Sequence, residues 1–185
     1  MVQSISTPMT FDDFLEWDDG TERSFELIDG VPVAITDPNA THEDVADGLC
    51  ALLTEHCRAL NLSYVPKRSK QLKIETEPGE REKSRRADII VFDRTEWLRL
   101  RDSSSPEVAY DAPPMVIEVV STNWRDDYLT KLGKYEAKGI KEYWIVDYAG
   151  YGGVRYIGSP KQSTVMVYQL GGNEYLPGRA FQAGD

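Results

Sequence analysis

A single acidic residue interrupts the most apolar run of the chain. Glu118 lies within Met115–Val120 (MVIEVV), whose other residues are all apolar and which predicts a buried strand. A carboxylate in a dry strand costs free energy unless a metal ion, a cationic side chain or a shared proton compensates it. A second acid, Asp88, precedes a similar run, Ile89–Phe92. Two acids on two buried strands indicate a divalent-metal site, and such sites commonly act on phosphate esters.

The chemistry of phosphodiester hydrolysis indicates which other groups such a site requires. It needs a hard cation on the phosphate, an activated water and a positive charge that offsets the developing negative charge. Magnesium takes oxygen ligands, usually one or two carboxylates with several waters, so Asp88, Glu118 and the backbone carbonyl of Val119 are the candidate metal ligands. Lys131, on the helix expected after the Glu118 strand, is the candidate for the positive charge.

Each of these residues also has a structural interpretation. Asp88 can be an acid at a strand edge that faces water, and Glu118 can form an ion pair with Arg85 or Arg86. Lys131 lies four residues after Asp127, an ordinary helical pair, so a functional role for the lysine depends on the two acids. His42 would more often begin or cap a helix than take part in catalysis.

Length and composition limit the class of protein. The 185 residues predict a single domain (1–185), with a core at about 22–181 and an N-terminal tail at 1–9. No stretch approaches the roughly 20 apolar residues that span a bilayer. The first residues lack a basic segment followed by an apolar core, so no secretory signal and no membrane association are expected. Cys50 and Cys57 are two helical turns apart, too far for a disulfide, which favours a cytoplasmic location.

Charge is distributed unevenly along the chain. The net charge of −10 disfavours loose binding to nucleic acid, although a local basic surface remains compatible with it. Residues 67–86 contain eight Lys and Arg against four Glu. This segment is either a solvated hairpin or a surface that steers phosphates.

Periodicity and turn signals predict the order of the elements. The expected helices lie at about 10–17, 42–60 and 127–138. The expected strands lie at 25–28, 31–35, 63–65, 70–74, 88–92, 115–120, 142–147, 154–157, 164–170 and 174–176. The segment 96–114 is expected to be a loop that can include a helical turn. The unit 115–147 reads strand–helix–strand, which favours a parallel pair with a right-handed crossover. The predicted class is α/β, with a central mixed sheet flanked by helices, an N-terminal hairpin turning at Asp29-Gly30 and a C-terminal antiparallel meander.

Two segments, ADIIVFD (87–93) and PPMVIEVVSTNWRDDYLTKLGKYEAKGIKEYWIVD (113–147), together with FELIDGVPV (25–33), resemble the Uma-two family of endonucleases. That family belongs to the PD-(D/E)XK, restriction-endonuclease-like superfamily. The resemblance implies that Asp88 and Glu118 bind the metal and that Glu26 is an additional acid near the site. The superfamily lysine usually stands two positions after the glutamate, where this chain has Val120, and the resemblance implies that Lys131 replaces it.

The sequence therefore predicts an endonuclease that depends on Mg²⁺ or Mn²⁺ and cleaves phosphodiester bonds in double-stranded DNA. A homodimer is expected because cutting two strands favours two symmetric sites. The alternative is a catalytically inactive DNA- or protein-binding module on a nuclease scaffold, which the missing lysine at Val120 and the acidic surface favour. Retention of the buried acids favours the enzyme. A third interpretation is a hydrolase of RNA or of a nucleotide.

Overall fold

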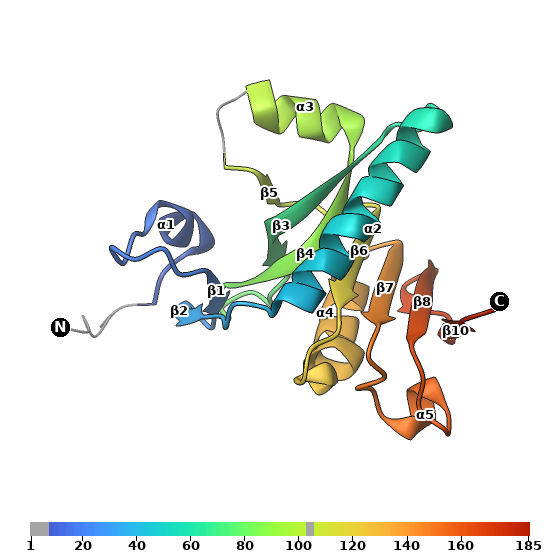
Figure 1. Cartoon of the computed structure of the whole chain (residues 1–185). Helices are drawn as coiled ribbons and strands as arrows, with labels where there is room; N and C mark the ends of the chain where they lie inside the picture. The colour runs from blue at the N-terminus through green and yellow to red at the C-terminus, as the bar shows by residue number, and fades with distance from the viewer. Residues whose placement is uncertain (1–7, 103–105) are drawn as a thin grey trace.

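The computed structural model describes residues 8–102 and 106–185 (Figure 1). Its helical elements are α1 (Phe11–Glu16), α2 (Ala40–Ala59), α3 (Arg94–Asp102), the π-helix η1 (Asp126–Lys131), α4 (Leu132–Lys138) and α5 (Val154–Ile157). Its strands are β1 (Phe25–Ile28), β2 (Val31–Ala34), β3 (Tyr64–Ile74), β4 (Lys83–Asp93), β5 (Val108–Ala109), β6 (Met115–Val119), β7 (Glu142–Asp147), β8 (Thr164–Gly171), β9 (Glu174–Tyr175) and β10 (Arg179–Gln182). None of the helices within the described ranges is long and apolar enough to cross a membrane.

One mixed sheet carries most of the chain. Its strands follow the order β10-β8-β7-β6-β4-β3-β5, and β9 also pairs with β8. The strands β6 and β7 are parallel and are joined by η1 and α4, which confirms the predicted strand–helix–strand unit. The neighbours β4 and β6 are antiparallel, and this pairing brings the two acid-bearing segments side by side.

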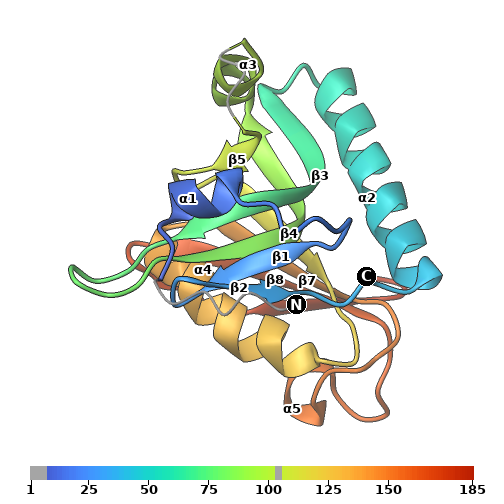
Figure 2. The same ribbon diagram turned by 90° about the vertical axis from the view of Figure 1, so that its left-hand side faces the viewer.

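Helices cover the two faces of the sheet (Figures 1 and 2). Against one face, α2 places Ala46 in an apolar cluster with Ile89, Ile117 and Val146. Against the other face, η1 and α4 contribute Tyr128 and Tyr135 to a larger cluster, whose sheet residues include Ala87, Ile90, Val116 and Ile145. Successive residues of a strand face opposite sides of a sheet, so Glu118, two residues after Val116, belongs to the face beneath α4.

The N-terminal segment forms a small layer of its own. The strands β1 and β2 pair as a hairpin, and Asp29 (φ 50°) and Gly30 (φ 73°) supply the left-handed turn that the Asp-Gly pair predicts. Thr10 caps α1 in a capping box with Asp13. Of the predicted tail at 1–9, residues 1–7 lie outside the described residues, and the backbone N–H of Met9 donates to the Gly30 carbonyl (2.8 Å).

The prediction of a strand at 154–157 was wrong. These residues form the short helix α5, which starts after Gly153; the Tyr156 and Ile157 backbone N–H groups both donate to its carbonyl. Ile157 is buried, and the Tyr156 ring packs on Tyr128 at a centroid distance of 4.8 Å. Periodicity cannot distinguish a short apolar strand from a helical turn. Here the packing of Tyr156 and Ile157 favours the helical turn.

Other boundaries also differ from the prediction. The two strands expected at 63–65 and 70–74 are one strand, β3, because its middle residues stay paired with β4. The segment expected as a loop contains α3 and β5, since Leu100 is buried and the Trp97 ring packs near Phe92 at 5.3 Å. The C-terminal antiparallel meander is present, and it includes β10, a strand that the sequence pattern did not predict.

Candidate active site

Asp88 and Glu118 lie opposite each other where β4 and β6 separate. The ladder between these strands runs from Val91 and Met115 to Ile89 and Ile117, and its next step is the pair of acids. The Asp88 backbone N–H donates to Glu118 Oε2 (3.4 Å), and the Val119 N–H donates to Asp88 Oδ2 (2.8 Å). The Glu118 side chain is 1% exposed and that of Asp88 is 20% exposed. Glu118 therefore lies in the core, and Asp88 lies nearer the surface.

A local irregularity of the sheet releases Asp88 from ordinary strand geometry. The pairing of β3 with β4 includes Arg68 with Ile89 and Lys70 with Ala87, but the pair between them, Ser69 and Asp88, is missing. Ser69 has φ 52°, a conformation that residues other than glycine seldom adopt. Such interruptions re-aim side chains next to functional sites.

Lys131 reaches the acids from the neighbouring helix. Its Nζ lies 3.1 Å from Glu118 Oε2 and 2.8 Å from Asp127 Oδ1. The lysine is the last residue of the π-helix η1, a helix type that is rare and is often found at functional sites. The structure therefore brings together Asp88, Glu118 and Lys131, the three residues on which the sequence argument depended. The ion pair of Glu118 with an arginine is not formed; Lys131 takes that place.

Three carboxyl groups, those of Asp88, Glu118 and Asp127, gather around the single ammonium group of Lys131. Burial raises the pKa of Glu118 to about 8; Lys131 opposes this shift, while the charges of Asp88 and Asp127 add to it. Burial also raises the pKa of Asp127. Burial lowers the pKa of Lys131, but the charges of Glu118 and Asp127 outweigh it and raise that pKa well above its ordinary value. The lysine is therefore charged, and a further cation would lower the energy of the remaining carboxylates.

Two further residues hold the acids from opposite faces of the sheet. The hydroxyl of Tyr135, on α4, donates to Glu118 Oε1 (2.5 Å). The Nε2 of His42, in the first turn of α2, lies 3.2 Å from Asp88 Oδ2 and 2.9 Å from the Val119 carbonyl oxygen. That carbonyl, predicted as a metal ligand, therefore already has a polar partner.

Sequence reasoning did not predict the partners of His42, because they are remote in the chain. Val119 follows it by 77 residues. The local pattern predicted only a helix start, and the His42 backbone N–H does donate to the Asn39 side chain that caps α2 (2.9 Å). The one local signal was a histidine on the face of the helix that becomes buried.

Glu26 lies beside the cluster in an ion pair of its own. Its Oε2 accepts from Arg85 Nη1 (2.6 Å), and its Oε1 accepts from the Arg86 backbone N–H (2.9 Å). Within residues 8–102 and 106–185, no polar contact joins Glu26 to Asp88, Glu118 or Lys131. Arg85 continues to Asp126 Oδ1 (3.4 Å), at the start of η1. The charge of Glu26 is thus matched by an arginine, and its role as an additional acid of the site stays a prediction.

The basic segment 67–86 occupies most of β3, the start of β4 and the turn between them. Most of its cationic side chains serve internal contacts. Those that form ion pairs with carboxylates are Arg68, Lys70, Lys73, Lys83 and Arg85. The segment is therefore largely a set of intramolecular pairs, which favours the structural interpretation for these residues.

A comparison with models of known protein families shows the family of this chain. A family model named Uma2, described as "Putative restriction endonuclease", matches residues 11–185. The chain belongs to the Uma2 family. Membership confirms the resemblance expressed by the 87–93 and 113–147 segments and supports a nuclease-like function.

A solved structure shares the fold of this Uma2 chain. It is a protein of Anabaena variabilis ATCC 29413, described as "a putative nuclease belonging to DUF820", with a TM-score of 0.69 at 19% sequence identity. The match covers 96% of this chain and 87% of the other. The likeness confirms the predicted fold class, a central mixed sheet flanked by helices. No curated protein matches the sequence.

Restriction-endonuclease-like families generally use divalent metals, and the donor set of this Uma2 chain fits one. Asp88 and Glu118 offer the one or two carboxylates that magnesium requires, and waters complete its shell. The described residues contain no group of three or more His, Cys, Asp and Glu suited to a metal, so a site with many protein ligands is not indicated there. Asp88 also lines an open cavity of about 350 Å³, through which water and a phosphate can approach.

Proposed function

We propose that this member of the Uma2 family is a divalent-metal-dependent endonuclease that hydrolyses phosphodiester bonds in double-stranded DNA. The observation that carries the proposal is the convergence of Asp88, Glu118 and Lys131, with a third carboxyl group, Asp127, on the same lysine, beside an open cavity. Asp88 and Glu118 hold Mg²⁺ or Mn²⁺, with the Val119 carbonyl as a further oxygen. When bound, the ion polarises the phosphate and lowers the pKa of a coordinated water.

The surrounding side chains have separate roles in this proposal. Lys131, held between Glu118 and Asp127, presents a fixed positive charge to the negative charge that develops on the phosphate. Tyr135 and His42 fix the two carboxylates from opposite faces of the sheet. Their hydrogen bonds limit the motion of the acids, which is the usual function of groups behind metal ligands.

Glu26 acts through Arg85 in this proposal. The pair connects the N-terminal hairpin to β4 and, through Asp126, to the first residue of η1. It therefore supports the helix that carries Lys131. This role differs from that of a metal ligand, because the Arg85 guanidinium already neutralises the carboxylate.

The rival function is a catalytically inactive binding module. One observation favours it: Glu118 and Asp88 already have Lys131, Tyr135 and His42 as internal partners, which can hold a buried acid without an ion. The net charge of −10 also disfavours a DNA substrate. Metal binding and cleavage separate the two functions.

The test is a plasmid-nicking assay with Mg²⁺ or Mn²⁺, combined with calorimetric titration of Mn²⁺. The wild type is expected to nick DNA and bind the ion, and Asp88→Asn is expected to lose both. The matched control is Asp93→Asn on the same strand, where the acid only accepts from the Thr95 backbone N–H (2.8 Å). Nicking of DNA by the wild type without a divalent metal, or full nicking activity of Asp88→Asn, would overturn the proposal. RNA and single-stranded DNA substrates test the preference for duplex DNA.

Dimerisation and a cytoplasmic location stay predictions. A dimer would place two equivalent sites on the two strands of a duplex. Sedimentation equilibrium with and without duplex DNA measures the stoichiometry. A single chain bound to each cut site would contradict the expectation of a dimer.

A further inference from the structure

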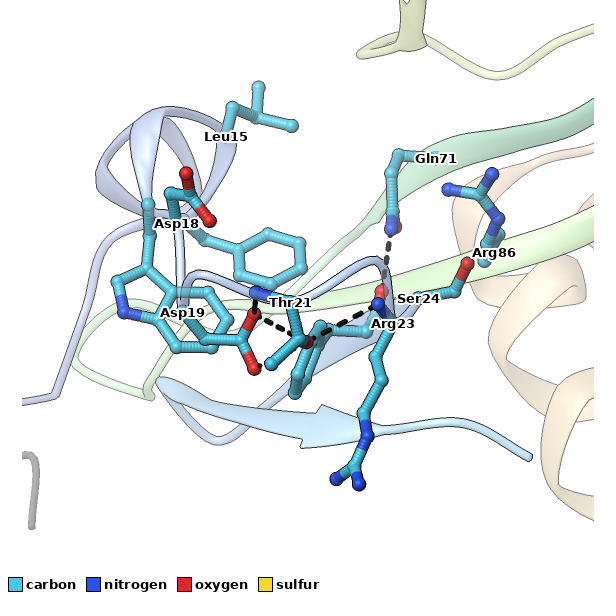
Figure 3. A pocket seen from close by; sticks show the side chains of 11 residues that line it. Leu15, Asp18, Asp19, Thr21, Arg23, Ser24, Gln71 and Arg86 are labelled. Atoms are coloured by element: carbon cyan, nitrogen blue, oxygen red, sulfur yellow. Dashed lines mark hydrogen bonds between the residues drawn. The ribbon is translucent and has the colours of Figure 1, made fainter. Parts of the chain in front are cut away.

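A second cavity adjoins the candidate active site. It has a volume of about 370 Å³ and lies between the segment that joins α1 to β1 and the strands β3 and β4 (Figure 3). Ser24 and Arg86 line both this cavity and the cavity of about 350 Å³ that contains Asp88. The two cavities therefore share part of their walls. Each has the size of a small-ligand site.

Arg86 is the cation at the junction of the two cavities. It is partly buried, yet within residues 8–102 and 106–185 its guanidinium has neither an ion pair nor a hydrogen bond. Its backbone is held firmly, since β4 pairs with β3 at Gln71 and the Arg86 N–H donates to Glu26 Oε1 (2.9 Å). The neighbouring Arg85, by contrast, is paired with Glu26 and Asp126. A guanidinium without a counterion, carried on a fixed backbone, is well suited to a phosphate.

The other end of the cavity is aromatic and acidic. In Figure 3, Asp18 and Asp19 lie on the side of the pocket opposite Arg86 and Ser24. The adjacent Trp17 is partly buried and lines the cavity. Its ring stacks on that of Phe14 (centroids 6.4 Å apart, interplanar angle 22°) and meets that of Phe25 edge to face (4.9 Å, 86°). Aromatic side chains held in this way stack nucleic-acid bases without sequence preference.

Acceptor groups in the wall match the edge of a base. Gln71 Nε2 donates to the Phe25 carbonyl (2.7 Å), which fixes the orientation of the amide. Gln71 Oε1 is then a buried acceptor without a partner in the described part of the chain. A buried carbonyl of this kind costs free energy unless a ligand or water donates to it. Asp19 already accepts from Thr21 and Asp18 Oδ1 from the Gly20 N–H (2.7 Å), which leaves Asp18 Oδ2 as a further acceptor for the N–H donors on the edge of a base.

We propose that this cavity binds one unstacked nucleotide of the DNA substrate, next to the bond that is cleaved, with Arg86 on its phosphate and Trp17 stacked on its base. The inference rests on the proposed nuclease function and extends it to the neighbouring nucleotide. The arginine end faces the Asp88 cavity, so the nucleotide lies with its phosphate toward the acids and its base toward α1.

The test is the binding of a short single-stranded oligonucleotide that contains one 2-aminopurine, followed by fluorescence in EDTA and in Mn²⁺. In the wild type, stacking on Trp17 is expected to quench the emission. Trp17→Leu is expected to abolish the quenching and to weaken binding by about 5- to 100-fold, the range of one base–aromatic stack. Arg86→Gln is expected to weaken binding by about 10-fold and to lower the slope of log affinity against log salt by about 1.

Matched controls distinguish a site from a general loss of charge or structure. Arg81→Gln removes an exposed arginine of the same β3–β4 hairpin that does not line the cavity, and Trp144→Leu removes a partly buried tryptophan of β7. Both are expected to bind as the wild type does. Because Trp17→Leu can loosen the packing of α1, Trp17→Phe serves as a second variant, which keeps an aromatic face and should retain most of the binding. Thermal melts establish that each variant is folded.

The outcomes separate this inference from the proposed function. If DNA is cleaved in an Asp88-dependent manner while Arg86→Gln and Trp17→Leu bind the oligonucleotide as the wild type does, the subsite is overturned and the nuclease stands. If no cleavage is seen but binding depends on Arg86 and Trp17 and not on Arg81 or Trp144, the subsite stands and the nuclease falls. Equal losses in the control variants would overturn the subsite as well.

Discussion

Two buried glutamates of this protein occupy opposite electrostatic surroundings. Glu118 on β6 and Glu26 on β1 are 1% and 7% exposed. Glu26 has the Arg85 guanidinium at 2.6 Å and a backbone N–H at 2.9 Å. Glu118 accepts a hydrogen bond from Tyr135 and pairs with Lys131, but the Lys131 ammonium group also pairs with Asp127. Burial alone therefore does not mark a functional acid; the balance of charge around it does.

The difference has a chemical consequence. Removing one partner of a buried ion pair leaves an uncompensated charge, so the pair of Glu26 and Arg85 is a structural element that resists change. The centre around Glu118 contains an excess of carboxylates and gains from an additional cation. We therefore expect substitution of Glu26 to affect stability and substitution of Glu118 to affect activity.

Glu118→Gln is expected to have the largest effect on activity. The amide keeps the shape of the side chain but removes the metal-binding oxygen charge, so DNA nicking should fall by at least about 1,000-fold. Calorimetry should detect no Mn²⁺ binding. Because burial already favours the neutral acid, the melting temperature should change by only a few degrees. Retained activity would place the metal elsewhere.

Glu26→Gln is expected to lower stability more than activity. Arg85 would lose its buried counterion, and the free energy of unfolding should fall by about 3 to 5 kcal/mol, measured by urea denaturation. The double variant Glu26→Gln with Arg85→Met should recover much of that loss, because both buried charges are removed and the remaining carboxylate, Asp126, is 24% exposed. Loss of Mn²⁺ binding with unchanged stability would instead identify Glu26 as a metal ligand.

Lys131→Met tests whether the ammonium group acts in catalysis. The cleavage rate at saturating metal should fall by about 100- to 1,000-fold, since one preorganised positive charge is lost from the transition state. Metal binding should survive. The control is Lys134→Met, one turn further along the same helical segment, where the lysine is partly buried and contacts neither Glu118 nor Asp127. The reverse result would transfer the catalytic role to Lys134.

Tyr135→Phe is expected to have the smallest effect. The substitution removes only the hydroxyl that donates to Glu118 Oε1 (2.5 Å). Groups that orient a metal ligand typically contribute 10- to 100-fold, so Mn²⁺ affinity and the cleavage rate should each fall by about 10-fold. Calorimetry and nicking kinetics measure the two quantities. A change in stability without any change in metal affinity would show that Tyr135 only packs against the sheet.

Much of the fold followed from local patterns. The alternation and length of apolar runs predicted β6, β7 and the helix between them, and the Asp-Gly pair predicted the turn of the first hairpin. These features depend on residues that are close in the chain. The failure at 154–157 has the same origin, because four residues are too few for periodicity to separate a strand from a helical turn.

The sequence by itself determined that Glu118 sits in a buried strand and that Asp88 begins another, since an acid within an apolar run is visible without any structure. Only the tertiary structure decided their partners. His42 joins Asp88 from α2, Lys131 joins Glu118 from η1, and Arg85 turns to Glu26. These contacts link residues that are remote along the chain. The order of the strands brings them together, and the charge balance that separates the two glutamates exists only once the sheet has formed.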